Sequence, residues 1–599
     1  MDHAGAATPP SPAIHWHAWA RLILAVAATT LLTLGWGRTV IMSMLLGAPE
    51  WQVATISLAV FVLICLLTWR LRPAFTTSSS WTQLDTRVAT GLMLLWCGAY
   101  AGLFVWYIVA FVPLWQIYAV FVPSTFWVLF ASWFGWWPAR LALKLGLLAM
   151  LLLLAVDFPL LVTVIGLAGD SSVNLGWRLP DRVDRPAKRR VQSRPSPSSA
   201  ARAVLPPLTT TDFARYLGPN GNAMLPSAKV TGDWKVQAPK QRWRVPLGEG
   251  WGSFAIVGEF CFTQLQDGDD ECVVCLELHT GNEVWRHADT VRFAASMGGP
   301  GPRATPTFAE GKLFSVGAGG LLNCLDAANG HLLWHVDLMA DNGVTKNLEH
   351  GVCASPLVYG GKVYVSPPGE DGKSLVAYDA GSGKRLWQAG QHRASYSSPM
   401  FAELAGVPQI LVFHANGVTA HAPDDGSVLW SHPWNNSVHV NVSQPLIIQN
   451  NRQEAMVLLS TGYDKGSTLL QISRPASGAW LVKTMWESRE LKTKFTTAVL
   501  FDGYVYGLDD GILCCMDPKT GKRNWKAGRY NHGQILLAGD RIIVQAEDGS
   551  VALVEPNPKE LIERGRIRAL SSKTWNHPAL AGRMLLVRND QEAVCYELP

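Results

Sequence analysis

Short polar segments recur at one position of a repeat in the second half of the chain, and their side chains could bind a ligand. Each segment comes just before a predicted strand, at a point where the chain enters near the centre of the fold. The candidate binding residues are Trp251, Arg303, His350, Tyr396, His439, Lys494, His532, Asn576 and His577. Cationic groups pair with carboxylates, and aromatic rings stack on planar ligands or cations. The set predicts a site for an anionic, aromatic ligand such as a carboxylate-rich quinone, with a glycan or a peptide terminus as further options. The alternative is that these groups satisfy one another and buried water.

Cysteine and aspartate motifs elsewhere in the chain favour structural roles. The adjacent pair Cys514–Cys515 occupies two ordinary strand positions, and Cys272 and Cys275 face opposite ways if they share a strand. Neither pattern indicates a zinc site. The acidic turn at 267–270 could hold Ca²⁺ loosely, but an Asp-Gly hairpin is the simpler interpretation. The stretch Gly372–Ser374 lacks the preceding glycine of a phosphate-binding loop.

A repeated turn must position the candidate residues. Segments such as LDAANGHLLW and YDAGSGKRLW end at Trp285, Trp334, Trp387, Trp430 and Trp525, with a degenerate copy ending at Trp486. In the turn, Asp caps backbone amides and Gly supplies positive φ, and the Trp that follows can pack between neighbouring sheets. Repeats of about 40–50 residues with four strands each indicate a β-propeller. We expect eight blades, with seven as the alternative, and ring closure by pairing VCYEL near the C-terminus with QRWRVPL at 241–247.

The first part of the chain is strongly apolar. Residues 20–168 hold three acids, and apolar runs lie near 20–37, 52–69, 89–112, 115–137 and 145–168. Each run is about as long as a helix that spans a bilayer. The predicted fold class is therefore an α-helical multi-span membrane domain of about five helices followed by an all-β domain. If the fourth run is re-entrant, the number of spans is four.

Basic residues orient this predicted membrane domain. With five spans and the N-terminus inside, Arg70, Arg72, Arg87, Arg140 and Lys144 all fall in cytoplasmic loops. The segment after residue 170 then lies in the periplasm. We expect location in the bacterial inner membrane, with the propeller facing the periplasm and the lipid bilayer as one partner.

Two further features complete the domain organisation. Asp157 is the one acid well inside an apolar run, which could suggest a transporter or channel, but a protonated or hydrogen-bonded Asp beside Pro159 is the favoured interpretation. Pro, Ser and Arg dominate from 170 to 208, as in an extended tether. The expected domains are a transmembrane domain at 1–169, a linker at 170–208 and a propeller at 209–599.

Composition excludes several protein classes. The 599 residues carry a net charge of +5, which is too mild to indicate nucleic-acid binding. Ten cysteines in a chain of this length do not make a disulfide scaffold. With 48% hydrophobic residues, the chain is not intrinsically disordered.

The propeller half resembles the pyrroloquinoline-quinone (PQQ)-type propeller repeat family. That family includes quinoprotein alcohol dehydrogenases and the propeller lipoprotein of the outer-membrane β-barrel assembly machinery. Segments such as RYLGPNG (215–221), GGPGPRATPTF (298–308) and KTWNHPALAG (573–582) are similar to those of bacterial membrane proteins in which hydrophobic spans precede such a propeller. The dehydrogenases hold their quinone on the propeller axis beside Ca²⁺, with carboxylate and amide ligands and an Asp base. This chain shows no assignable set of that kind, and no C-x-x-C-H haem attachment.

These observations favour a membrane-anchored periplasmic scaffold or sensor that binds a protein or ligand, with a periplasmic or membrane protein as its partner and no nucleic acid. No catalytic residue, metal ligand or certain cofactor is assigned, and an enzymatic role is the weaker interpretation. The alternative is a PQQ-dependent dehydrogenase that uses Ca²⁺ and passes electrons to the membrane.

Overall fold

The computed structural model describes residues 162–167, 173–177, 203–230, 232–295, 298–369, 373–475 and 478–599. The chain divides into two compact units, residues 1–183 and 184–599. In the first unit, β1 (Val162–Leu167) and β2 (Val173–Trp177) form an antiparallel two-stranded sheet. The second unit contains the propeller.

The prediction of an α-helical multi-span domain is wrong for the part of the chain that the structure describes. That part is almost entirely β, and α6 (Leu338–Asp341) is its sole helix. None of its helices is long and apolar enough to cross a membrane. The run at 145–168, predicted as the fifth span, ends in β1, whose sequence VTVIGL is rich in β-branched residues that favour strands. The other four runs and Asp157 lie outside the described residues.

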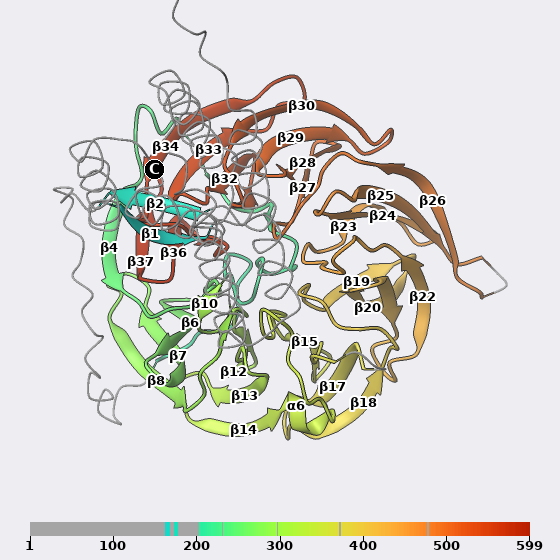
Figure 1. Ribbon diagram of the computed structural model, residues 1–599, viewed down its shortest axis with the longest axis horizontal. Helices are drawn as coiled ribbons and strands as arrows, with labels where there is room; N and C mark the ends of the chain where they lie inside the picture. The colour runs from blue at the N-terminus through green and yellow to red at the C-terminus, as the bar shows by residue number, and fades with distance from the viewer. Residues whose placement is uncertain are drawn as a thin grey trace, which may run out of the picture. The chain divides into compact units, whose positions relative to one another are not determined.

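Eight blades form the propeller, which confirms the expected count (Figure 1). Blade 1 comprises β5 (Ala255–Val257), β6 (Phe260–Asp267), β7 (Asp270–Glu277) and β8 (Glu283–Asp289). Blade 2 comprises β11 (Thr307–Ala309), β12 (Lys312–Val316), β13 (Leu321–Asp326) and β14 (Leu332–Asp337). Blade 3 comprises β15 (Leu357–Tyr359), β16 (Lys362–Val365), β17 (Leu375–Asp379) and β18 (Arg385–Ala389). Blade 4 comprises β19 (Met400–Leu404), β20 (Val407–His414), β21 (Gly417–His421) and β22 (Val428–Pro433).

The remaining blades follow the same antiparallel order. Blade 5 comprises β23 (Leu446–Asn450), β24 (Glu454–Thr461), β25 (Gly466–Ser473) and β26 (Leu481–Ser488). Blade 6 comprises β27 (Val499–Phe501), β28 (Tyr504–Asp509), β29 (Ile512–Asp517) and β30 (Lys522–Arg529). Blade 7 comprises β31 (Gln534–Ala538), β32 (Arg541–Gln545), β33 (Ser550–Glu555) and β34 (Ile562–Arg568). Blade 8 comprises β35 (Ala579–Ala581), β36 (Met584–Arg588), β37 (Glu592–Glu597) and β4 (Lys240–Pro246).

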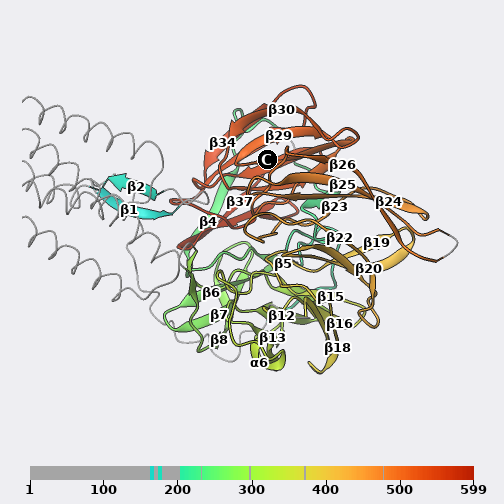
Figure 2. The same cartoon turned by 45° about the vertical axis from the view of Figure 1, so that its right-hand side comes forward.

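Strand β4 closes the ring, as the sequence predicts. It pairs antiparallel with β37, with Trp243 opposite Cys595 and Lys240 opposite Glu597. The two strands lie side by side in both views of the ribbon (Figures 1 and 2). The first strand of the propeller therefore completes its last blade, so that neither end of the ring is left as an open sheet edge.

The repeated turn locks each blade to the next. Trp285 of blade 1 donates from Nε1 to the carbonyl of Ala327 in the turn of blade 2, at 3.0 Å. The glycine of that turn, Gly330, has φ +75° and packs so closely on the Trp285 ring that a Cβ there would lie 2.5 Å from it. Gly383 contacts Trp334 in the same way one blade further on. The spacing between Asp, Gly and Trp in the repeat thus encodes blade-to-blade packing.

Apolar side chains fill the spaces between blades. Phe262 of blade 1 stacks on Phe308 of blade 2, with ring centroids 6.4 Å apart. These rings belong to a cluster that spans the two blades and includes Trp285. A four-stranded blade is apolar on both faces, so each blade needs its neighbours to cover it.

The chain before β4 crosses the centre of the ring. We call residues 212–225 the axial segment. Its Phe213 forms a β-bridge with Ile256 of β5. The segment ends in β3 (Met224–Leu225), which pairs parallel with β31. Phe213, Leu217 and Ala223 are fully buried. The axial segment therefore occupies the axis between blades that are far apart in sequence. The preceding residues also contact the ring, since the Ala203 amide donates to the Ala328 carbonyl at 2.7 Å.

A short hairpin lies between blades 1 and 2. It pairs β9 (Ala294–Ala295) with β10 (Gly299–Pro300).

Candidate ligand-binding face

The candidate residues lie at one end of the ring. Each predicted segment runs directly into the first strand of a blade, and those strands are β5, β11, β15, β19, β23, β27, β31 and β35. The first strand of a blade is innermost, as β15, β23 and β27 show in Figure 1. Because these strands all enter from the same end, the segments gather on one face, which we call the entry face.

An aromatic cluster forms the most ordered part of the entry face. The Trp251 and Trp575 rings lie 4.7 Å apart between centroids, and Phe495 approaches Trp575 edge-on at 5.6 Å. Lys573 Nζ lies 4.4 Å from the Trp575 centroid and 5.7 Å from that of Trp251. Burial lowers the pKa of Lys573 below its usual range, while nearby carboxylates act in the opposite direction. The ammonium thus contacts two π faces, as in cation–π pairs.

Hydrogen bonds hold this cluster in place. Trp575 Nε1 donates to Glu547 Oε1 at 2.7 Å, and Trp251 Nε1 donates to the Gly298 carbonyl. His532 is buried, its ring lies 5.3 Å from that of Phe495, and its amide donates to Glu547 Oε2 at 3.3 Å. The two partly exposed indoles therefore have fixed orientations before any partner binds.

A second group joins blades 2, 3 and 4. The His350 and Tyr396 rings lie 5.3 Å apart, and the Arg303 guanidinium lies 5.1 Å from the Phe293 ring. Arg303 donates to the carbonyls of Gly299, at 2.7 Å, and Gly301. Burial lowers the pKa values of both His350 and Arg303. The lowered pKa favours the neutral His350 imidazole at pH 7, so it contributes an aromatic ring rather than a charge.

Two predicted residues stand apart from these groups. Lys494 Nζ lies 5.7 Å from the Tyr463 ring. His439 is exposed and has φ +56°, a left-handed conformation that is uncommon for residues other than glycine. Both remain accessible on the entry face.

Asn576 and His577 lie inside the fold and do not face the rim. Asn576 Nδ2 donates to the carbonyls of Gly250, at 3.2 Å, and Gly252, at 2.7 Å. The His577 ring nitrogens bond the carbonyls of Pro578, at 2.7 Å, and Ile535, at 2.9 Å. Burial lowers the pKa of His577 to about 4. These two side chains connect blade 8 to its neighbours rather than offering groups to a ligand.

Sequence reasoning missed Trp575, Lys573 and Phe495. Phe495 and Trp575 directly follow or precede the selected residues Lys494 and Asn576, and Lys573 lies three positions before Asn576. One signal was available for Trp575. It directly precedes the buried Asn576 and His577, so its own side chain is expected to point away from the interior. Which way each one points depends on the local turn, and composition does not contain that information.

The other motifs have the structural character expected of them. Cys514 and Cys515 are buried free thiols on opposite faces of β29, and burial raises the pKa of Cys515 to about 11. Cys272 and Cys275 likewise belong to different clusters on either side of β7. In the acidic turn, Asp267 pairs with Arg286 at 2.6 Å.

The residues described here do not fit a Ca²⁺–quinone centre. Within the described ranges, no three His, Cys, Asp or Glu side chains are grouped so as to hold a metal ion. The carboxylate beside the tryptophan pair, Glu547, accepts bonds from Trp575 and from the His532 amide. The one amide side chain predicted for the site, Asn576, donates to backbone carbonyls. The axial segment also occupies the centre of the ring.

Comparisons with known proteins support the family resemblance. A family model described as outer membrane protein assembly factor BamB, of the PQQ_2 type, matches residues 269–527. The chain carries a PQQ-like β-propeller. Outer membrane protein assembly factor BamB of Yersinia pestis is 27% identical over 272 residues, which cover 41% of this chain and 64% of that protein. The quinohemoprotein alcohol dehydrogenase ADH-IIG of Pseudomonas putida is 30% identical over 146 residues, which cover 22% of this chain and 19% of that enzyme.

The chain thus spans less than two thirds of each of these relatives. Among solved structures, a europium-containing methanol dehydrogenase is similar with a TM-score of 0.48 and 14% identity, covering 63% of this chain and 90% of that chain.

Proposed function

We propose that this propeller is a periplasmic scaffold that binds a protein partner through its entry face. The observation that carries the proposal is the pair of partly exposed indoles, Trp251 and Trp575, held 4.7 Å apart beside Lys573. Trp, Tyr and Arg dominate binding hot spots, because they bury large areas and lose little entropy on binding. Hydrogen bonds to Glu547 and Gly298 fix both rings in advance, which lowers the entropic cost of association.

The neighbouring groups suit the rim of such an interface. Tyr396, Lys494 and Tyr463 add aromatic and cationic groups to the same face, and these can meet an acidic or polar surface. The similarity to an outer membrane protein assembly factor supports a protein rather than a small molecule as the partner.

Affinity purification after cross-linking in cells tests this proposal. The tagged full-length chain should recover a reproducible partner, and the double variant Trp251→Ala, Trp575→Ala should lose it while folding normally. Tyr359→Ala is the matched control, because Tyr359 is an exposed aromatic residue at the far end of β15, away from the entry face. Equal recovery by the double variant would contradict the proposal.

The proposed location is the periplasmic side of the bacterial inner membrane. Its support is the apolar composition of residues 20–168 together with the similarity to an outer membrane protein assembly factor. Added protease should cleave the predicted linker at 170–208 in spheroplasts. Protection of that linker until the cells are lysed would place the propeller in the cytoplasm.

A PQQ-dependent dehydrogenase is the alternative, and the 30% identity to a quinohemoprotein alcohol dehydrogenase favours it. A titration of the full-length chain with PQQ, with and without Ca²⁺, separates the two functions. Saturable stabilisation that requires Ca²⁺ would favour the dehydrogenase. No shift in the unfolding midpoint is expected for a scaffold.

A further inference from the structure

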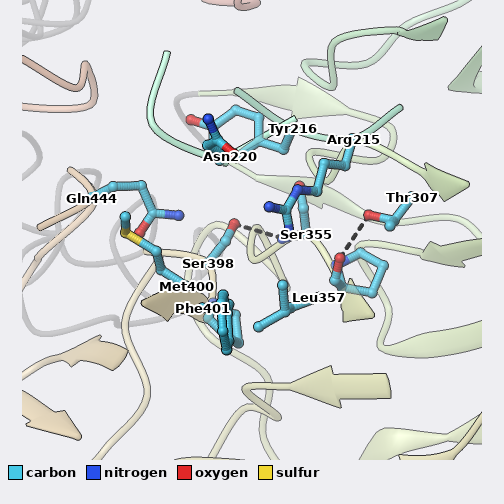
Figure 3. Close-up of a pocket in the computed structure, with 13 residues that line it drawn as sticks. Arg215, Tyr216, Asn220, Thr307, Ser355, Leu357, Ser398, Met400, Phe401 and Gln444 are labelled. Atoms are coloured by element: carbon cyan, nitrogen blue, oxygen red, sulfur yellow. Dashed lines mark hydrogen bonds between the residues drawn. The ribbon is translucent and has the colours of Figure 1, made fainter. Parts of the chain in front are cut away.

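A small cavity lies between the axial segment and the inner strands of blades 2 to 4 (Figure 3). Arg215, Tyr216 and Asn220 of the axial segment line one side, and Ser398 and Gln444 line the other. The cavity is partly open to solvent, and its volume of about 20 Å³ is enough for a water molecule or a small ion. A quinone or a peptide side chain of ordinary size does not fit.

Arg215 brings an unpaired positive charge to this cavity. Its Nε and Nη2 both donate to the Pro219 carbonyl, at 3.0 Å and 2.5 Å, while Nη1 donates to no described residue. No ion pair of Arg215 with a described carboxylate is present. Burial lowers the pKa of Arg215, and no described acid offsets that effect. A partly buried cation without a counter-charge is costly unless an anion accompanies it.

Two side chains of the ring add further donors. The Ser398 hydroxyl accepts from the Ser355 amide at 2.8 Å, and its hydrogen has no acceptor among the described residues. Gln444 accepts at Oε1 from Ser397 at 2.8 Å, which leaves its Nε2 without a described partner. Both Ser398 and Gln444 are only 5% exposed. Figure 3 shows the guanidinium, the hydroxyl and the amide nitrogen pointing toward the same space.

We propose that this cavity binds a small monovalent anion, either chloride or a carboxylate no larger than acetate, between Arg215, Ser398 and Gln444. Arg215, Ser398 and Gln444 each direct a donor into the cavity, and together these three groups carry one positive charge, so a single monovalent acceptor satisfies them. The anion bridges the axial segment to the segments that lead into β19 and β23. It therefore holds the axial segment in the ring, independently of any partner on the entry face.

Thermal unfolding of the full-length chain at constant ionic strength tests this site. Sodium gluconate, whose anion is too large for the cavity, is exchanged stepwise for sodium chloride, formate or acetate. We expect a saturable rise in the unfolding midpoint of several degrees with one or more of the three small anions. A response to chloride alone identifies an inorganic ion, and a response to formate and acetate alone identifies a carboxylate.

Arg215→Gln should abolish this response. Arg474→Gln is the matched control, because Arg474 also donates to the carbonyl four residues ahead, at Gly478, yet is exposed. If Arg215→Gln does not fold, crystals of the unaltered chain grown with bromide give a second measurement. An anomalous peak beside Arg215 is then expected. An equal response of Arg215→Gln to the small anions, or bromide crystals with no such peak, would overturn the proposal.

Discussion

Arg588 should make an unusually large contribution to the stability of the ring. It lies in β36 of blade 8, is fully buried, and reaches blade 1 through its guanidinium. Nη1 donates to Thr263 Oγ1 and to the Gln264 carbonyl, both at 2.7 Å, and Nη2 donates to the Gly248 carbonyl at 3.1 Å. Burial lowers its pKa to about 9, so the residue remains charged at pH 7.

The magnitude follows from these bonds. Hydrogen bonds to charged groups contribute about 1.5–3 kcal/mol each, and a buried acceptor left without a donor costs about 1–3 kcal/mol. The Arg588→Met substitution removes two short bonds and three longer bonds, but it also relieves the burial of a charge. We therefore expect Arg588→Met to lower the free energy of unfolding by about 2–4 kcal/mol.

Urea unfolding of the full-length chain, followed by tryptophan fluorescence, measures this loss. Arg583→Met is the matched control, because the Arg583 side chain is 57% exposed and pairs with Glu597 at 3.5 Å. Arg583→Met should lower the free energy of unfolding by no more than about 0.5 kcal/mol. A loss of less than about 1 kcal/mol for Arg588→Met would refute the idea that this residue fastens the last blade to the first.

Three more predictions concern stability and reactivity. Folding lowers the pKa of His577 from its usual value near 6.5 to about 4, so the unfolded chain binds more protons between these two pH values. The free energy of unfolding should therefore drop by about 3 kcal/mol as pH falls through this window. In a pH series of urea titrations, His577→Gln should flatten that drop. By calorimetry, Gly383→Ala should destabilise the fold by about 2 kcal/mol or more, because its Cβ would lie 2.7 Å from the ring of the neighbouring blade's tryptophan. Gly360→Ala is the control, because Gly360 also has a positive φ (+58°) but has open space around it, so its loss measures the backbone strain alone. Equal losses for the two variants would contradict the packing argument. Burial raises the pKa of the thiols of Cys514 and Cys515, so both should resist a thiol reagent until the chain is unfolded in urea, and rapid labelling of the native protein would contradict their placement.

The propeller could be predicted from the sequence because its decisive contacts repeat. The glycine of each turn must have positive φ and must leave room for the tryptophan of the preceding blade, so the same letters recur at Gly330 and Gly383. The closing pair β4–β37 was also predictable, since the chain would otherwise leave a three-stranded blade. Both features follow from the local geometry of one turn and from its repetition around the ring.

The helical membrane domain was predicted from hydropathy, which measures the free energy of transfer and not the backbone conformation. An apolar run that ends in Val162, Thr163, Val164 and Ile165 satisfies a hydropathy window, yet these β-branched residues form a strand. Length and apolar character alone therefore did not distinguish a helix from a strand at the end of this run.

The composition of the entry face was predicted only in part. The segments and their common end of the ring follow from the repeat, but the meeting of Trp575 with Trp251 joins residues more than 300 positions apart. The axial segment was missed for the same reason. Its β3 is two residues long and pairs with β31 far along the chain, so RYLGPNG contains no local sign of its location.

Site-specific photo-cross-linking in living cells tests the scaffold function most directly. A photoreactive amino acid placed at Trp251 should give a discrete cross-linked band that contains a second protein. The same amino acid at Leu386, exposed on the outer strand β18, should give none. A discrete band from Trp251 alone is the result that the scaffold proposal predicts. No band from Trp251, or equal bands from the two positions, would contradict partner binding at the entry face.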